Sequence, residues 1–142
     1  MTQKGVAIGE AARRSGVKAP TIRYYEQIGL LPAPPREENN RRAYDAADLR
    51  RLSFIRHARE LGFEIAAIRS LLTLQDQPNQ DCDIVHAIAN DRLGEVEQRI
   101  ASLTALKAEL EMMILGCSHG HVANCRVIEV LADHGQCAHD RH

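Results

Sequence analysis

The chain has 142 residues, of which 44% are hydrophobic and 26% are charged, and its net charge is −1. This composition is typical of a folded globular protein and excludes a disordered polar chain. No run of about 18 apolar residues is present to span a membrane, and no apolar stretch follows a basic start to act as a secretion signal. We therefore expect a cytoplasmic protein without a membrane partner.

Charge and potential ligands are distributed unevenly along the chain. Residues 1–70 carry 13 Lys and Arg against 8 Asp and Glu, whereas residues 71–142 carry 5 against 11. A basic first half suits a polyanion partner such as nucleic acid, and chance surface charge is the alternative. All four cysteines and six of the seven histidines lie after residue 80. In a reducing compartment, such thiols are metal ligands or redox groups more often than disulfide partners.

Residues 6–28 predict two short helices joined by a tight turn. Small apolar residues recur on one helical face before Ser15-Gly16, where glycine tolerates the turn geometry. Pro20 suits the first turn of the second helix because its missing N–H is not needed there. Two short helices around a glycine turn form a helix-turn-helix.

An extended loop and two further helices follow. Pro32-Ala-Pro-Pro35 cannot be helical, and Asn39-Asn40 favours a hairpin turn, which we interpret as a wing. The stretch from Asp45 to Asp48 offers N-caps for a helix that ends at Leu61-Gly62, and a fourth helix ends near residue 75. These elements predict a winged helix-turn-helix DNA-binding domain over residues 1–77.

Basic and aromatic residues gather at two places in this domain. One is the second helix together with the residues that precede it, and the other is the wing. Arginine and lysine bind phosphates and guanine edges, and tyrosine hydroxyls donate to phosphates. The alternative is that Tyr24 or Tyr25 belongs to the core and that the arginines are only solvated. Taken together, the basic helix and the basic wing favour DNA binding. The predicted DNA contacts are Arg13, Lys18, Thr21, Arg23, Tyr24, Tyr25, Arg41, Arg42 and Tyr44.

Several segments resemble the MerR family of transcriptional regulators. By position, Arg23, Tyr24 and Tyr25 match the recognition-helix contacts of that family, and Arg42 and Tyr44 match its wing contacts. Lys18 stands where the family usually has a Ser or Thr cap, and Arg41 stands where the wing usually has an aromatic residue. The segments that carry the resemblance are Val6–Ala12, Gly16-Val17, Thr21-Ile-Arg-Tyr-Tyr-Glu-Gln-Ile-Gly-Leu-Leu-Pro32, Asn39 to Tyr44 and Phe54-Ile-Arg56.

The resemblance implies a dimer that binds double-stranded promoter DNA. In this family, the bound inducer makes the regulator distort the DNA so that RNA polymerase can use an overlong spacer. We therefore expect an activator whose partners are promoter DNA, RNA polymerase and a second copy of the chain.

Residues 83–115 predict a single long helix. The segment from Asp83 to Leu115 has no proline, and its only glycine is Gly94. Apolar residues recur there in alternating steps of four and three, which is the pattern of a coiled-coil seam. A helix of this length, ~50 Å at 1.5 Å per residue, cannot bury such a stripe on so small a domain, so we expect an antiparallel homodimer. Packing against residues 1–77 of the same chain is the alternative. The stripe consists of Ala89, Leu93, Val96, Ile100, Leu103, Leu110 and Ile114, with Lys107 interrupting it.

The cysteines predict a metal site shared between two chains. Cys82 and Cys117 lie 35 residues apart at the two ends of the long helix, so no ion binds both within one chain. An antiparallel partner brings Cys82 of one subunit beside Cys117 and Cys125 of the other, which gives two equivalent sites. His119 and His121 lie inside the intervening loop and are optional ligands. Three thiolates suit a soft or borderline divalent ion, namely Zn, Cd, Pb or Hg.

Other interpretations of the cysteines remain open. They can serve as small buried hydrophobic residues, and Cys137 with the tail histidines forms either a second metal site or a polar chain end. Metal-sensing members of the MerR family match at Cys117 and Cys125, and those that sense divalent ions also match at Cys82. Copper(I) sensors of the family usually carry Ser at that position.

The sequence thus predicts a mainly α fold with three parts. These are the winged helix-turn-helix domain over residues 1–77, a coiled-coil dimerisation helix over 78–116, and a metal-binding loop, short helix and mobile tail over 117–142. We expect a regulator that activates a heavy-metal efflux or detoxification gene in response to a divalent ion. A copper(I)-responsive regulator and a thiol metal-buffering protein are the alternatives. An enzyme is not expected, because no glycine-rich phosphate loop or acid–base pair is present.

Overall fold

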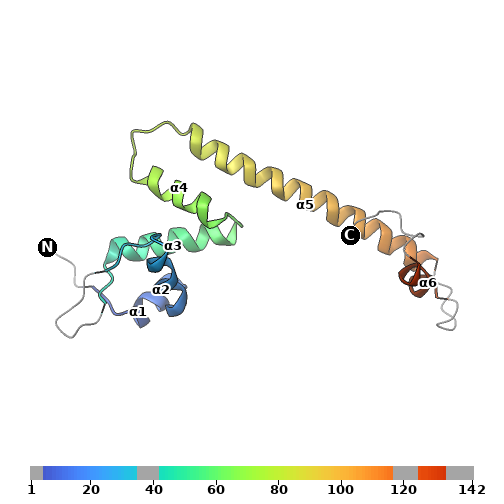
Figure 1. Cartoon of the computed structure of the whole chain (residues 1–142), viewed down its shortest axis with the longest axis horizontal. Coiled ribbons are helices and arrows are strands. Elements are labelled where there is room, and N and C mark those ends of the chain that lie inside the picture. The colour runs from blue at the N-terminus through green and yellow to red at the C-terminus, as the bar shows by residue number, and fades with distance from the viewer. Residues whose placement is uncertain (1–4, 35–41, 117–124, 134–142) are drawn as a thin grey trace. The chain divides into compact units, whose positions relative to one another are not determined.

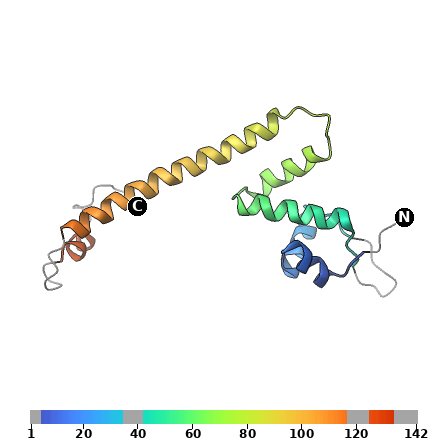
Figure 2. The same ribbon diagram turned by 180° about the vertical axis from the view of Figure 1, so that it is seen from behind.

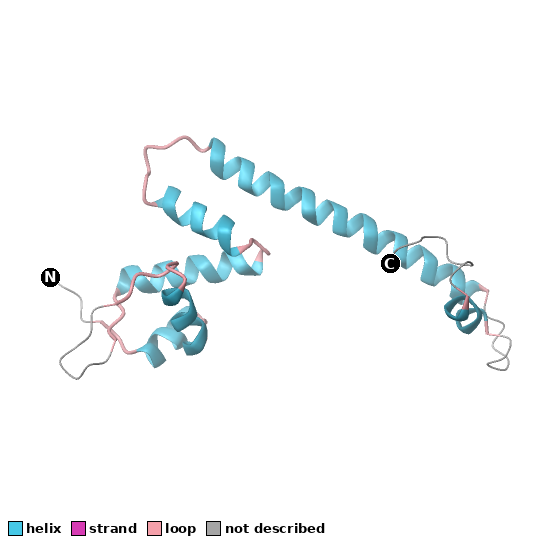
Figure 3. Cartoon of the chain, viewed as in Figure 1, coloured by secondary structure: helices cyan, strands magenta, loops and turns pink. Residues whose placement is uncertain are grey.

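A computed structural model of the chain describes residues 5–34, 42–116 and 125–133 (Figure 1). These ranges are mainly helical, as Figure 3 shows, which confirms the predicted fold class. None of the helices in the described ranges combines the length and the apolar character of a membrane span. The helices are α1 (Ile8–Ser15), α2 (Ala19–Gln27), α3 (Ala46–Glu60), α4 (Ile65–Gln75), α5 (Asp83–Leu115) and α6 (Arg126–Ala132).

The chain divides into two compact units, residues 1–88 and residues 89–142. The first unit contains α1 to α4 and the beginning of α5, and the second contains the rest of α5 together with α6. The boundaries predicted from the sequence, after residues 77 and 116, divide the chain by expected function and not by compactness. This functional division stays a prediction.

The turn between α1 and α2 forms as the sequence predicts. α1 ends at Gly16, whose φ of 75° is left-handed, and the Gly16 N–H donates to the Ala12 carbonyl at 2.9 Å. A Cβ at Gly16 would lie 2.7 Å from Arg56 Nη1, so glycine also lets this α3 side chain approach. Pro20 lies in the first turn of α2. As a result α1 packs against both α2 and α3.

One hydrophobic core joins the first four helices. The Val6 and Tyr44 backbones form an antiparallel bridge with two N–H···O bonds of 2.8 Å each, which ties the N-terminal segment to the residues before α3. Asp45 and Asp48 form a reciprocal capping box at the start of α3. The predicted hairpin turn at Asn39-Asn40 lies outside the described residues. The largest fully buried side chains are Tyr44, Ile22, Leu30, Leu31, Leu52, Ile55, Ile68 and Leu72.

Two arginines from neighbouring helices hold the segment that follows α2. Arg51 of α3 donates from Nε to the Leu30 carbonyl at 2.7 Å, and Arg69 of α4 donates from Nη2 to the Ile28 carbonyl at 2.6 Å. These carbonyls lie where the helical hydrogen bonds run out, so the guanidinium groups take the place of absent N–H donors. The C-terminal end of α2 is therefore fixed to both α3 and α4.

In the second unit, α6 lies beside the C-terminal part of α5 (Figures 1 and 2). Met113 of α5 and Val130 of α6 are buried there. A Cβ at Gly116 would come within 2.7 Å of Arg126 Cγ, so glycine permits this close approach. A cavity of about 430 Å³ is lined by Glu109, Met112, Met113, Leu115, Gly116, Arg126 and Val130.

The predicted stripe of α5 is largely uncovered by the described part of the chain. Leu93, Ile100, Leu103, Leu110 and Ile114 are between 53% and 61% exposed. A single helix that exposes this many large apolar side chains leaves a surface that needs a partner.

Candidate nucleic-acid interface and metal ligands

The second helix of the helix-turn-helix turns its two adjacent tyrosines in different directions. Tyr24 is 48% exposed and lies beside the exposed Arg23, whereas Tyr25 is only 7% exposed and belongs to the core. Successive residues of a helix point about 100° apart, and here that step takes Tyr25 into the core while Tyr24 stays at the surface. The ring centroids are 6.0 Å apart and the ring planes are inclined by 47°. This arrangement presents Arg23 and Tyr24, and not Tyr25, to an outside partner.

Tyr44 is also placed inside the molecule. Its side chain is fully buried, and its hydroxyl donates to Glu26 Oε1. Burial and the bond to Glu26 raise the pKa of Tyr44 to about 12. Arg42 pairs with the other carboxylate oxygen of Glu26, with 2.9 Å between Nη1 and Oε2. Of the two predicted wing contacts that the structure describes, only Arg42 reaches the surface.

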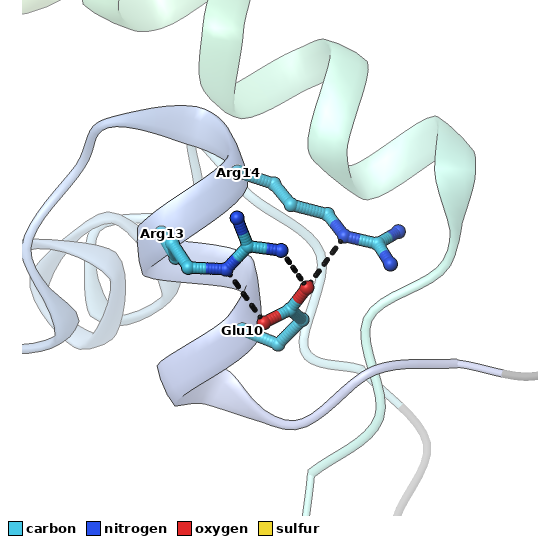
Figure 4. A network of polar contacts seen from close by, with 3 residues as sticks. All are labelled: Glu10, Arg13 and Arg14. Carbon is cyan, nitrogen blue, oxygen red and sulfur yellow. Dashed lines mark hydrogen bonds and ion pairs between the residues drawn. The ribbon is translucent and has the colours of Figure 1, made fainter.

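The arginines of α1 share a single carboxylate, as Figure 4 shows. Glu10 accepts from Arg13 through both oxygens, with Nε at 2.9 Å from Oε2, and from Arg14 Nε at 2.9 Å. The hydrogen bond from Arg13, followed by that from Arg14, lowers the pKa of Glu10 to about 2. Glu10 is therefore ionised at neutral pH and offsets one of the two positive charges. Both arginines remain exposed to solvent.

The remaining predicted DNA contacts lie around the start of α2. Lys18 is the exposed N-cap residue of α2, and its side chain makes no capping bond. Thr21 is half-buried in the first turn. Arg41 lies outside the described residues.

Sequence reasoning missed both glutamates of these networks. Glu10 stands three and four residues before its arginine partners, which is the spacing of helical ion pairs and was a usable signal. Glu26 meets partners 16 and 18 residues further along the chain, and no local pattern indicates such a contact.

Two of the predicted metal ligands, Cys82 and Cys125, are among the residues that the structure describes, and each lies at the start of a helix. Cys82 is exposed just before α5, and its carbonyl accepts the His86 N–H at 2.9 Å. Cys125 is half-buried and is the N-cap residue of α6. Neither thiol is in a disulfide within the described ranges. Cys117, His119 and His121 lie outside those ranges, and no three His, Cys, Asp or Glu side chains converge among the residues that are described.

Comparisons with known proteins agree with the helix-turn-helix architecture. Residues 6–75 match the family profile described as MerR HTH family regulatory protein, and residues 49–113 match the one described as MerR, DNA binding. The HTH-type transcriptional regulator ZntR of Escherichia coli K12 is 40% identical over 128 residues, which cover 87% of this chain and 90% of ZntR. The regulator HmrR of Rhizobium leguminosarum bv. viciae is 39% identical over 126 residues, which cover 89% of this chain and 97% of HmrR.

A solved structure extends the similarity to three dimensions. The transcription regulator PbrR691 from Ralstonia metallidurans CH34, crystallised in complex with lead(II), superposes with a TM-score of 0.77 at 35% identity. The match covers 89% of this chain and 98% of PbrR691. On the strength of both profiles, these relatives and the shared fold, the chain belongs to the MerR family of helix-turn-helix transcription regulators.

Proposed function

We propose that this protein activates transcription of a heavy-metal efflux or detoxification gene when a thiophilic divalent ion binds to it. The observation that carries the metal response is the exposed thiol of Cys82 at the start of an unbroken helix of 33 residues. The protein acts in the cytoplasm and catalyses no reaction itself.

DNA binding is assigned to the exposed basic and aromatic side chains of the first unit. Arg23 and Tyr24 of α2 enter the major groove, and Arg13, Lys18, Arg41 and Arg42 contact phosphates. The half-buried Thr21 donates its hydroxyl to a phosphate at the start of α2. Tyr25 and Tyr44 support these contacts from the core.

The metal ligands come from both subunits of a homodimer. A helix of 33 residues is about 50 Å long, and Cys82 precedes its first residue whereas Cys117 follows its last residue by two positions. Antiparallel pairing of two such helices brings Cys82 of one subunit to Cys117 and Cys125 of the other. Three thiolates, with His119 or His121 as optional further ligands, fit Zn, Cd, Pb or Hg.

Pairing of the subunits also explains the exposed stripe of α5, which becomes the dimer seam. Each shared site then joins the two subunits at one end of the seam. Metal binding therefore changes the arrangement of the two DNA-binding units, which distorts the bound promoter segment so that RNA polymerase can start transcription.

A metal titration of the purified protein tests this function. Thiolate-to-metal absorption is followed while Zn, Cd, Pb, Hg or Cu(I) is added, with a Cys82→Ser variant as the control. Tight binding of a divalent ion that the variant loses supports the proposal. Tight binding of Cu(I) alone, unchanged by the substitution, favours the copper(I)-responsive alternative. Metal binding without affinity for any promoter fragment indicates a thiol buffer instead.

A further inference from the structure

Glu26 belongs to the same helix, α2, as the candidate DNA contacts Arg23 and Tyr24, and follows them by three and two residues. Its side chain is only 7% exposed, although it carries a charge. Both carboxylate oxygens have partners from the segment before α3: Oε1 accepts from the Tyr44 hydroxyl, and Oε2 pairs with Arg42 Nη1 at 2.9 Å. A single side chain of α2 therefore holds two residues of that segment.

The Tyr44 end of this contact is rigid. The Tyr44 side chain is fully buried, and its backbone forms the two 2.8 Å bonds with Val6. A buried charge is tolerated only when it is paired and hydrogen-bonded, so Glu26 constrains its partners in turn.

The Arg42 end is different, because 34% of the Arg42 side chain is exposed. The guanidinium group is planar and offers donors on more than one edge. With Nη1 committed to Glu26, the group is held in one orientation while its exposed part stays accessible to a phosphate.

We propose that Glu26 is a positioning residue for promoter recognition, which orients Arg42 toward the DNA and fixes its spacing from Arg23 and Tyr24. This inference rests on the proposed DNA-binding function. A phosphate contact sets the register of a protein on the duplex only if its donor is held at a defined place. Through Glu26, the α2 contacts and the Arg42 contact move as one body.

Removing the Glu26 charge has opposite effects on specific and non-specific binding. In Glu26→Gln, the neutral amide holds Arg42 more weakly than the carboxylate does, so affinity for the correct sequence falls. The same change frees a cation and removes a negative charge, so non-specific affinity rises and its salt dependence steepens by about one unit of log–log slope. A variant that was merely destabilised would lose affinity for both kinds of DNA.

The experiment compares Glu26→Gln with Glu64→Gln. Glu64 is exposed in the same unit, and its side chain makes no capping bond, so this control removes the same charge without touching Arg42. The probes are a duplex selected by the wild-type protein from a random-sequence pool and a scrambled duplex of equal composition. Fluorescence anisotropy over a salt series gives both affinities, and circular dichroism gives Tm.

For Glu26→Gln, we expect the ratio of the two affinities to fall about tenfold, the loss of one oriented contact, while the ratio for Glu64→Gln stays near that of wild type. Equal behaviour of the two variants, or a parallel fall of both affinities, would overturn the inference. If Glu26→Gln does not fold, Glu26→Asp replaces it in the experiment. Its shorter side chain keeps the charge but cannot reach both Tyr44 and Arg42. Wild-type specificity in Glu26→Asp would also overturn the inference. A wild-type protein that selects no duplex contradicts the proposed function itself, and with it this inference.

Discussion

Individual residues of α2 divide sharply between surface and core. Arg23 and Tyr24 are exposed, whereas Ile22 and Tyr25 are buried, so a helix of nine residues both anchors itself and presents side chains to a partner. Replacing an exposed residue of this helix should alter DNA binding without affecting the fold.

Arg23→Ala therefore tests the proposed interface. If Arg23 binds a phosphate, the substitution weakens binding to all sequences and lowers the salt slope by about one. If Arg23 reads a base instead, affinity for the correct duplex falls by ~1–3 kcal/mol while non-specific binding is kept. Anisotropy titrations at several salt concentrations separate these cases, with the exposed Arg99→Ala of α5 as the control. Affinity and slope that both match the control would remove Arg23 from the interface.

Tyr44 predicts a pH dependence of stability at the alkaline end. Its pKa is raised to about 12 from an ordinary value of 10.0, because burial and the bond to Glu26 favour the protonated hydroxyl. The folded state thus holds this proton more tightly than the unfolded state, and the resulting stability is full below pH 10 and is lost as pH rises toward 12. Tyr44→Phe should flatten this loss in denaturant titrations at increasing pH, with the exposed Tyr24→Phe as the control. An alkaline profile that Tyr44→Phe leaves unchanged would contradict the assignment.

At the scale of whole elements, the helices could be predicted because residues at or next to their ends determine where they begin and stop. Gly16 and Pro20 separate α1 from α2, and Asp45 with Asp48 starts α3. The absence of proline likewise gives α5 its length. The sequence left open whether Tyr25 lies in the core or contacts DNA, and it did not indicate the burial of Tyr44, because burial depends on which helix faces meet in the folded core. The bonds from Arg51 and Arg69 to backbone carbonyls are likewise tertiary contacts without a sequence signal.

The exposed stripe of α5 gives a prediction at this scale. Leu103→Asp places a charge in the proposed seam, and burying it unpaired costs several kcal/mol, so the dimer should dissociate or unfold. Ser102→Asp introduces the same charge one position away, outside the stripe, and should leave the assembly intact. Light scattering at micromolar concentration measures the mass of each variant. A Leu103→Asp protein that remains dimeric and folded would exclude this face as the seam.

At the scale of the whole molecule, the MerR family predicted from the sequence is confirmed by the similarity to ZntR, HmrR and PbrR691. One of these relatives, PbrR691, was crystallised with lead(II), which supports the proposed response to a heavy metal. The metal site itself stays a prediction. Its ligands lie on either side of a helix of 33 residues, so one chain alone does not define their geometry. The choice among divalent ions depends on that geometry, and residue types alone do not decide it.

Sharing of the site between subunits can be tested with mixed dimers. A Cys82→Ser chain and a Cys117→Ser/Cys125→Ser chain each lack ligands at both ends of their homodimers. Their heterodimer combines the intact Cys82 of one chain with the intact Cys117 and Cys125 of the other at one end only. We expect the purified heterodimer to bind about half as much metal as the wild type with near-native affinity, as a shared site requires.

The matched controls are the two mutant homodimers, which should show no tight binding under the same conditions. Metal analysis after gel filtration gives the stoichiometry, and competition with a chelator gives the affinity. A heterodimer that binds no metal tightly would refute the shared site, since a site within one chain cannot be rescued by a partner that is broken elsewhere.

The uncovered stripe of α5 also has a genetic consequence. If every chain must pair with another copy, the products of two alleles in one cell are mixed at random. A chain that pairs normally but cannot read DNA then enters most dimers, and with equal expression only roughly a quarter of them retain two intact copies. Loss-of-function alleles in the DNA-binding unit should therefore be dominant over the wild type, whereas alleles that destroy the seam should be recessive.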